Sequence, residues 1–136
     1  MQDVLSLLLA GSQGECIVKK RVVNVSEGDR HDFDWGSITW LHSGAFSGSK
    51  ELTLAEVLIK AGAHNPIHTH ANCEEVLYLL EGELDHSCGD EPPSRLVPGS
   101  AICIQRGVPH GATCVSRCDA SMVVAYSSPD REMTGE

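Results

Sequence analysis

Short apolar runs separated by turn-forming residues dominate the chain. The runs are rich in β-branched side chains, and Gly, Pro, Asn, Asp or Ser interrupts them about every 8 to 12 residues. This pattern predicts strands, which we expect at 15–25, 37–46, 51–60, 75–81, 83–88, 95–97, 100–104, 110–118 and 121–127. Residues 26–35 are expected to form a loop, 47–49 a turn, and 128–136 a loosely held tail. Many short strands without a convincing helix predict an all-β sandwich or barrel.

One run fits two kinds of structure. In residues 51–60, Leu52, Ala55 and Ile59 lie near helical spacing, whereas Leu52, Leu54 and Leu58 alternate as they would on one face of a strand. A run of this length does not distinguish the two by periodicity.

A candidate metal site follows this run. His68 and His70 are two residues apart, so in an extended segment both imidazoles leave the same face, with Cα atoms roughly 6.5 Å apart. The polar segment after them fits a turn, and Glu75 opens the next apolar run. The neighbouring strand would therefore supply a third ligand, with Glu74 as the competing carboxylate.

Two motifs give the chain a family resemblance. The pattern G-x5-H-x-H-x4-E-x6-G resembles the first motif of the cupin family and falls on Gly62, His68, His70, Glu75 and Gly82. The second cupin motif, G-x5-P-x-G-x2-H-x3-N, is matched in spacing by Gly99, Gln105, Gly107, His110 and Cys114. Gln105 replaces the usual proline and Cys114 the usual asparagine, and neither position holds a metal ligand in the family.

The resemblance implies an all-β jelly roll, a double-stranded β-helix, with a strand at 51–60. It also implies that His68, His70, Glu75 and His110 bind one divalent transition metal, Fe, Mn, Ni, Cu or Zn. Glu75 is preferred to Glu74 because six residues then separate it from Gly82. Four protein ligands leave two positions of an octahedral ion free for water, substrate or dioxygen.

Strand alternation predicts a pocket wall beside these ligands. Residues that share a strand face with Glu75 or His110 should line it. They are Leu77, Leu79, Ala112 and Cys114. His64 is interpreted as a turn residue, and His86 faces inward or outward depending on register. Possible contributors to substrate binding are Gln105, Arg106, Trp35 and Trp40.

Length and charge restrict the function further. The 136 residues fit one domain, 1–136, and the net charge of −9 with a pI near 5.1 argues against a nucleic-acid or anionic-membrane partner. The apolar run Val4–Ala10 lacks the positive region of a signal peptide and is too short for a membrane span, so we expect a cytoplasmic protein.

Six cysteines show no C-x-x-C pair and no secretory context, so we interpret them as reduced, small apolar residues. We also expect a homodimer, because the cationic strand 15–25 and the run 4–10 offer surface that one barrel does not bury alone.

Three classes of function fit the predicted site. The first is a dioxygenase-like enzyme in which a small organic substrate and O₂ occupy adjacent metal positions. The second is a non-redox isomerase, cyclase or lyase in which the metal polarises a carbonyl or enolate. The third is a small-molecule sensor without turnover. No acid–base pair beyond the ligands is evident in the sequence, which favours the first class.

Overall fold

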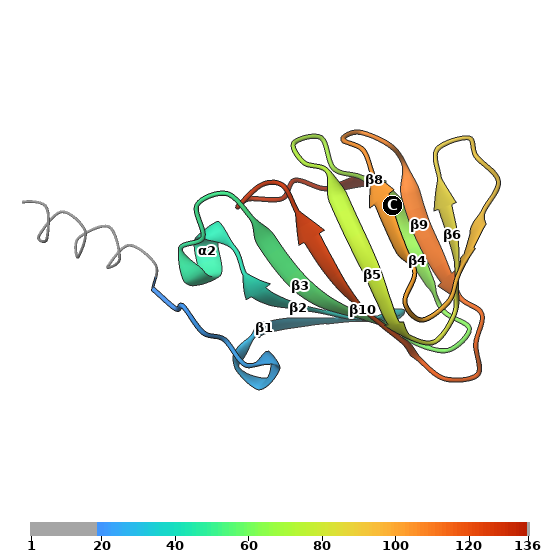
Figure 1. Ribbon diagram of the computed structural model, residues 1–136, viewed down its shortest axis with the longest axis horizontal. Helices are drawn as coiled ribbons and strands as arrows, with labels where there is room; N and C mark the ends of the chain where they lie inside the picture. The colour runs from blue at the N-terminus through green and yellow to red at the C-terminus, as the bar shows by residue number, and fades with distance from the viewer. Residues whose placement is uncertain (1–18, 136) are drawn as a thin grey trace, which may run out of the picture.

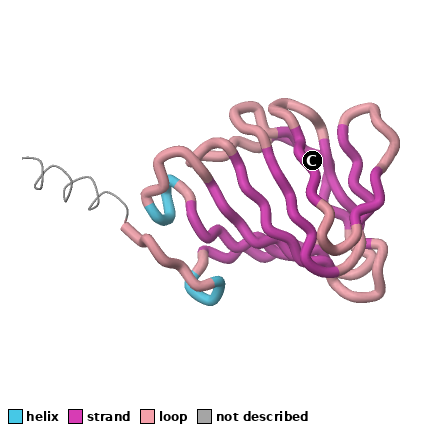
Figure 2. The backbone as a smooth tube through the Cα atoms, viewed as in Figure 1, coloured by secondary structure: helices cyan, strands magenta, loops and turns pink. Residues whose placement is uncertain are grey.

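The computed structural model describes residues 19–135 and consists almost entirely of strands in two antiparallel sheets (Figures 1 and 2). One sheet has six strands in the order β1-β2-β3-β10-β5-β8, and the other has five in the order β11-β4-β9-β6-β7. The strands are β1 (Asp29–Phe33), β2 (Gly36–His42), β3 (Thr53–Ile59), β4 (His64–Thr69), β5 (Glu75–Glu81), β6 (Leu84–Cys88), β7 (Ser94–Leu96), β8 (Ala101–Ile104), β9 (His110–Cys114), β10 (Ala120–Tyr126) and β11 (Thr134–Gly135). The helical elements are η1 (Val25–Glu27) and α2 (Gly44–Ser47). This is the predicted jelly roll.

The core lies between the two sheets. Alternate residues of each central strand point into it, because successive side chains of a strand leave opposite faces. In β5, Leu77 and Leu79 are at most 4% exposed, whereas Val76, Tyr78 and Leu80 are each more than 40% exposed. The same alternation holds in β3 and β10, which flank each other at the centre of the six-stranded sheet.

Most strand predictions are confirmed, and two are wrong at the N-terminal side. Residues 51–60 form β3, so alternation and not helical spacing describes that run. The predicted strand 15–25 has no strand in its described part, 19–25, while the predicted loop 26–35 contains β1. All five β1 residues are exposed, and the strand pairs with β2 through its backbone. The sequence of β1 therefore shows no alternation of buried apolar and exposed polar residues from which a strand could be predicted.

A short helix replaces the end of the predicted strand 37–46: β2 ends at His42, and α2 covers Gly44–Ser47, the last of which is the first residue of the predicted turn 47–49. The Ser43 hydroxyl caps α2 by accepting a hydrogen bond from Phe46 N, and Gly48 ends the helix at φ +79°. The cysteines fit their predicted role in part: among residues 19–135, Cys73 and Cys114 are buried, Cys103 and Cys118 are exposed, and none of the described cysteines is in a disulfide. Within the same range no helix has the length and apolar character to cross a membrane.

The motif glycines differ in what they contact, which leads to a stability prediction. Gly62 and Gly82 have φ of +78° and +81°, a region that strains other residues by about 1–2 kcal/mol. A Cβ on Gly82 would lie 2.7 Å from Ala120 Cα, whereas a Cβ on Gly62 meets nothing within 4 Å. We therefore expect Gly82→Ala to lower the free energy of unfolding by about 3 kcal/mol or more and Gly62→Ala by about 1 kcal/mol in urea titrations. Equal losses would contradict this account.

Candidate metal centre

Four side chains from both sheets meet at one point inside the barrel. One ligand atom from each of His68, His70, Glu75 and His110 lies within 4.8 Å of the others. His68 faces His110 across the β4–β9 pair, and directly opposed residues share a face. His70 follows β4 by one residue, and Glu75 opens β5 on the other sheet. Tertiary structure thus gathers the four residues that the sequence motifs contain.

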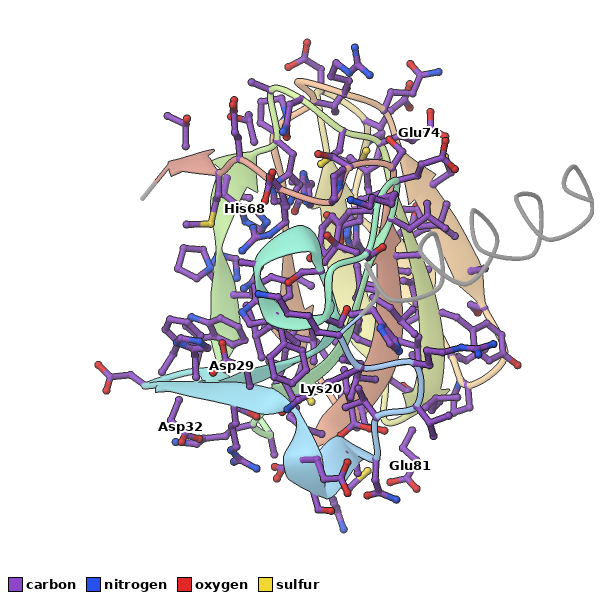
Figure 3. The ribbon with its side chains drawn as sticks, turned by 90° about the vertical axis from the view of Figure 1, so that its left-hand side faces the viewer. Lys20, Asp29, Asp32, His68, Glu74 and Glu81 are labelled. Atoms are coloured by element: carbon purple, nitrogen blue, oxygen red, sulfur yellow. The ribbon has the colours of Figure 1, made fainter. Side chains whose placement is uncertain are left out.

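Burial separates Glu75 from the competing carboxylate. Glu75 is 5% exposed and points inward, as do His70 and His110 at 2% each. Glu74 is exposed and lies at the periphery of the molecule, away from His68 (Figure 3). Its backbone N–H and C=O are hydrogen-bonded to Ser127. The strand that begins after Glu74 therefore directs only Glu75 toward the histidines.

Backbone carbonyls fix the tautomer of all three imidazoles. Nδ1 of His68, His70 and His110 lies 2.7, 2.8 and 2.9 Å from the carbonyl oxygens of Pro66, Glu132 and Val108. A carbonyl only accepts, so each Nδ1 carries a proton and donates it. In the neutral form, each Nε2 then presents a lone pair, as metal-binding imidazoles do.

The Nε2 atoms converge on the Glu75 carboxylate. Glu75 Oε2 lies 2.9 Å from Nε2 of His110 and 3.0 Å from Nε2 of His70, and only the His110 contact has hydrogen-bond geometry. The His70 Nε2 is thus buried without a hydrogen bond. Such a position requires a cation or a proton between the lone pairs.

The pKa values of these groups agree with an ionised Glu75 among the three imidazoles. Burial alone would raise the pKa of Glu75, but the hydrogen bond from His110 and the close contact with His70 lower it to about 2. Burial opposes charge on His110, yet the bonded Glu75 carboxylate raises the pKa of His110. Burial, opposed by the bond to Pro66, lowers the pKa of His68 to about 4. Three imidazole nitrogens and one ionised carboxylate therefore fit a divalent first-row transition metal.

A cavity of about 200 Å³ adjoins this group. Two predicted wall residues, Leu77 and Ala112, line it. Leu79 and Cys114 share the same strand faces but are fully buried in the hydrophobic core and do not line it, which corrects their predicted place. Both sit one alternation step further along their strands, where the two sheets pack directly on each other.

Only some of the residues predicted to contribute to substrate binding lie at the cavity. Trp35 lines the cavity and Trp40 borders a neighbouring hollow, whereas Gln105 and Arg106 line neither. His64, interpreted from the sequence as a turn residue, is instead the first residue of β4. It is exposed, and its Nδ1 is bonded to a threonine hydroxyl, Thr113 Oγ1.

His86 is a cavity residue, although its register left the direction open from the sequence. It is 2% exposed, lies nearly parallel to the His110 ring with centroids 6.1 Å apart, and lines the cavity. Its Nδ1 has no hydrogen-bond partner among residues 19–135. Burial, together with the nearby His110, lowers the pKa of His86 to about 4, so the ring is neutral at neutral pH. The pairing of His86 with inward-facing Ala112 decides its orientation.

The C-terminal segment packs against the site, which corrects the predicted loose tail for residues 128–135. Asn72 holds it by donating to Asp130 O and accepting from Glu132 N, and β11 pairs with β4. Arg131 and Met133 line the cavity. No pattern in this polar segment signalled a role, because its position depends on contacts with residues about 60 positions earlier.

Comparison with known proteins identifies the family. Residues 55–126, more than half of the chain, match the family model of the cupin domain. The chain is a cupin. A curated relative, dimethylsulfoniopropionate lyase DddQ of Ruegeria pomeroyi, is 32% identical over 76 residues, which cover 56% of this chain and 37% of that protein.

Solved structures support the cupin fold. Lactobacillus farciminis oxalate decarboxylase in complex with formate superposes with a TM-score of 0.75 at 15% identity, over 81% of this chain and 34% of that one. The polyketide cyclase RemF of Streptomyces resistomycificus gives 0.72 at 21% identity, over 85% and 84%. This cupin thus spans little more than a third of the lyase and of the decarboxylase, and 84% of the cyclase.

Proposed function

We propose that this cupin is a metal-dependent enzyme that converts a small organic molecule by non-redox chemistry, as a lyase, cyclase or isomerase. The observation that carries the proposal is the position of His86, a neutral imidazole in the cavity wall beside the convergent group His68, His70, Glu75 and His110. The sequence alone offered no acid–base residue beyond the ligands, and the lack of such a residue had favoured dioxygenase chemistry.

The residues have separate roles in this proposal. His68, His70, Glu75 and His110 would hold the metal. When bound, a divalent ion supplies Lewis acidity that polarises a substrate oxygen. His86 accepts or returns a proton at a ring nitrogen, as neutral imidazoles do in general acid–base catalysis.

The cavity wall supports such chemistry. Leu77, Ala112, Met122 and Val124 give it an apolar lining that excludes water and strengthens electrostatic interactions. Two of the relatives reported above are named as a lyase and a cyclase, and these names support the same class of reaction for this chain.

A dioxygenase is the second candidate. Three imidazoles and one carboxylate leave two positions of an octahedral ion free, and adjacent free positions suit a substrate oxygen together with O₂. Its distinguishing property is a requirement for oxygen and for a redox-active metal.

The two candidates are separated by metal and oxygen dependence. Protein purified without chelators or a histidine tag is analysed for metal, stripped, and reloaded with Mn, Fe, Ni, Cu or Zn. Consumption of dimethylsulfoniopropionate, oxalate and a panel of keto and hydroxy acids is then followed with and without O₂. We expect turnover with Zn or Mn that persists without oxygen. Turnover only with O₂ and a redox metal would favour the dioxygenase, and binding without turnover would indicate a sensor.

Replacement of His86 tests the carrying observation. We expect His86→Phe to lower kcat by about 100-fold or more while metal content stays unchanged, because general acid–base groups contribute about 10²–10⁴-fold. His64→Phe is the matched control, since His64 lies outside the cavity. An unchanged kcat in His86→Phe would refute the assigned role.

The homodimer and the cytoplasmic location stay predictions. Residues 4–10, which partly motivated the dimer, lie outside the described range, and residues 19–25 form no edge strand. A small molecule as the partner of the site agrees with the size of the cavity.

A further inference from the structure

Arg131 is a cation in the cavity wall that forms no ion pair within the described part of the chain. It lines the cavity beside Tyr126, and its guanidinium carbon lies 4.8 Å from the Trp40 ring centroid and 5.2 Å from that of Tyr126. Its Nε is buried without a hydrogen bond, and it forms no ion pair with any residue in the range 19–135. Arg131 as a whole is half-buried, and a guanidinium nitrogen that is removed from water normally has a hydrogen-bond partner.

The one polar neighbour of the guanidinium does not satisfy it. Arg131 Nη1 lies 3.4 Å from His70 Nδ1, but that nitrogen already donates its proton to Glu132 O at 2.8 Å. Two donors therefore face each other. The N–H groups of Arg131 are left without an acceptor among the described residues.

Neighbouring contacts hold Arg131 in this position. Asn72 bonds the backbone on both sides of it, through Asp130 O at 2.6 Å and Glu132 N at 2.9 Å. The His70 bond to Glu132 O adds a third contact, from a residue of the convergent group. The backbone of Arg131 is therefore held beside the cavity, and the guanidinium packs against the Trp40 and Tyr126 rings.

Charge balance favours an anion in this cavity. Among the described residues, Glu75 is the only carboxylate lining the cavity, and its contacts are with His110 and His70 and not with Arg131. With a divalent ion bound, Glu75 would offset only one of three positive charges, two from the ion and one from Arg131. Arg131 also borders a neighbouring hollow, but the two carboxylates there, Asp29 and Asp130, already balance the charges of Arg131 and Lys20.

We propose that Arg131 binds the carboxylate of the substrate, so that the site acts on a small organic carboxylic acid. The planar guanidinium presents paired N–H donors that match the two oxygens of a carboxylate. The reaction at the metal rests on the proposed function, whereas carboxylate binding by Arg131 does not.

Binding of propionate, compared with its uncharged analogue propionamide, tests the proposal. Affinities are measured by NMR titration and calorimetry on metal-free and Zn-loaded protein. We expect propionate to bind at least about tenfold more tightly than propionamide in both forms, because hydrogen bonds to charged groups contribute roughly 1.5–3 kcal/mol. With Mn²⁺ loaded, broadening of the propionate signals is expected and places the probe in the metal cavity.

Variants at position 131 identify the group responsible. Arg131→Gln should lower propionate affinity by about tenfold or more and leave propionamide affinity unchanged, while Arg131→Lys should recover part of the loss. Arg95→Gln is the matched control, because Arg95 is exposed and already paired with Asp85 and Glu83. If Arg131→Gln does not fold, the comparison of propionate with propionamide on the unmutated protein still tests whether the cavity prefers a carboxylate.

Three results would overturn the proposal: equal affinity for the two probes, no propionate binding at tens of millimolar, or full propionate affinity in Arg131→Gln. Propionate binding that depends on Arg131, in a protein without metal uptake or turnover, would support the carboxylate site and refute the proposed function alone.

Discussion

His70→Ala is expected to abolish stoichiometric metal binding, with an affinity loss greater than the 10–100-fold typical of residues that only orient a ligand. His70 Nε2 is buried, has no hydrogen bond, and lies 3.0 Å from Glu75 Oε2, so its removal takes away a donor and leaves the carboxylate without one neighbour. His110→Ala and His68→Ala should behave alike, because the same kind of backbone contact orients each ring. Metal per chain after dialysis, measured by mass spectrometry, reports the loss.

Two further variants make this result specific. Glu75→Gln keeps an oxygen donor but removes the charge, so we expect a smaller loss of metal than in His70→Ala. His31→Ala should retain the metal, because His31 is exposed and pairs only with Asp29. Full metal content in folded His70→Ala, with one ion per chain, would mean that the ion binds elsewhere.

Acid is expected to unfold the metal-free protein well above the pH at which its carboxylates titrate. His86 has its pKa lowered to about 4 in the folded state, against 6.5 for the free group. Between these values the unfolded chain binds the additional proton, so the stability falls as pH falls through this window. For His86, which is 2% exposed, the loss amounts to about 3 kcal/mol, a large part of the 5–15 kcal/mol typical of domains.

Other groups of the site extend or oppose this effect. His68 contributes in the same direction, since burial lowers its pKa to about 4, and Glu75 continues the loss from pH 4.5 to about 2. His110 has a raised pKa, so its contribution is complete below pH 6.5 and is lost as pH rises through the raised value. The net expectation is decreasing stability from pH 6.5 toward 4.

Urea unfolding in chelator at pH 7 and pH 4.5 measures the slope. The slope of stability against pH reports the number of additional protons bound by the unfolded chain, and His86→Phe should reduce that number by about one. A free energy of unfolding that is equal at both pH values would contradict the lowered pKa values.

Local sequence determined the strands of the barrel and the candidate ligands. Apolar residues alternate in burial along 75–81 because one face of β5 packs in the core and the other is exposed. Such a pattern can be recognised from the sequence. The ligands were readable because His68, His70 and Glu75 lie close together in the chain, at the end of β4 and the start of β5, and His110 lies in a second motif of fixed spacing. Glycines at positive φ, such as Gly82 between β5 and β6, form turns between the strands.

Tertiary structure alone decided the rest of the cavity. β1 was missed because a fully exposed edge strand is held by backbone hydrogen bonds, which no side-chain pattern encodes. His86 faces inward because of its register with Ala112, and a shift of one residue would reverse it. Arg131 reaches the site because Asn72 and His70 bind a segment about 60 residues later in the chain. Contacts at such separation depend on how the two sheets close on each other, so the sequence determined the metal ligands and the fold determined the groups that surround them.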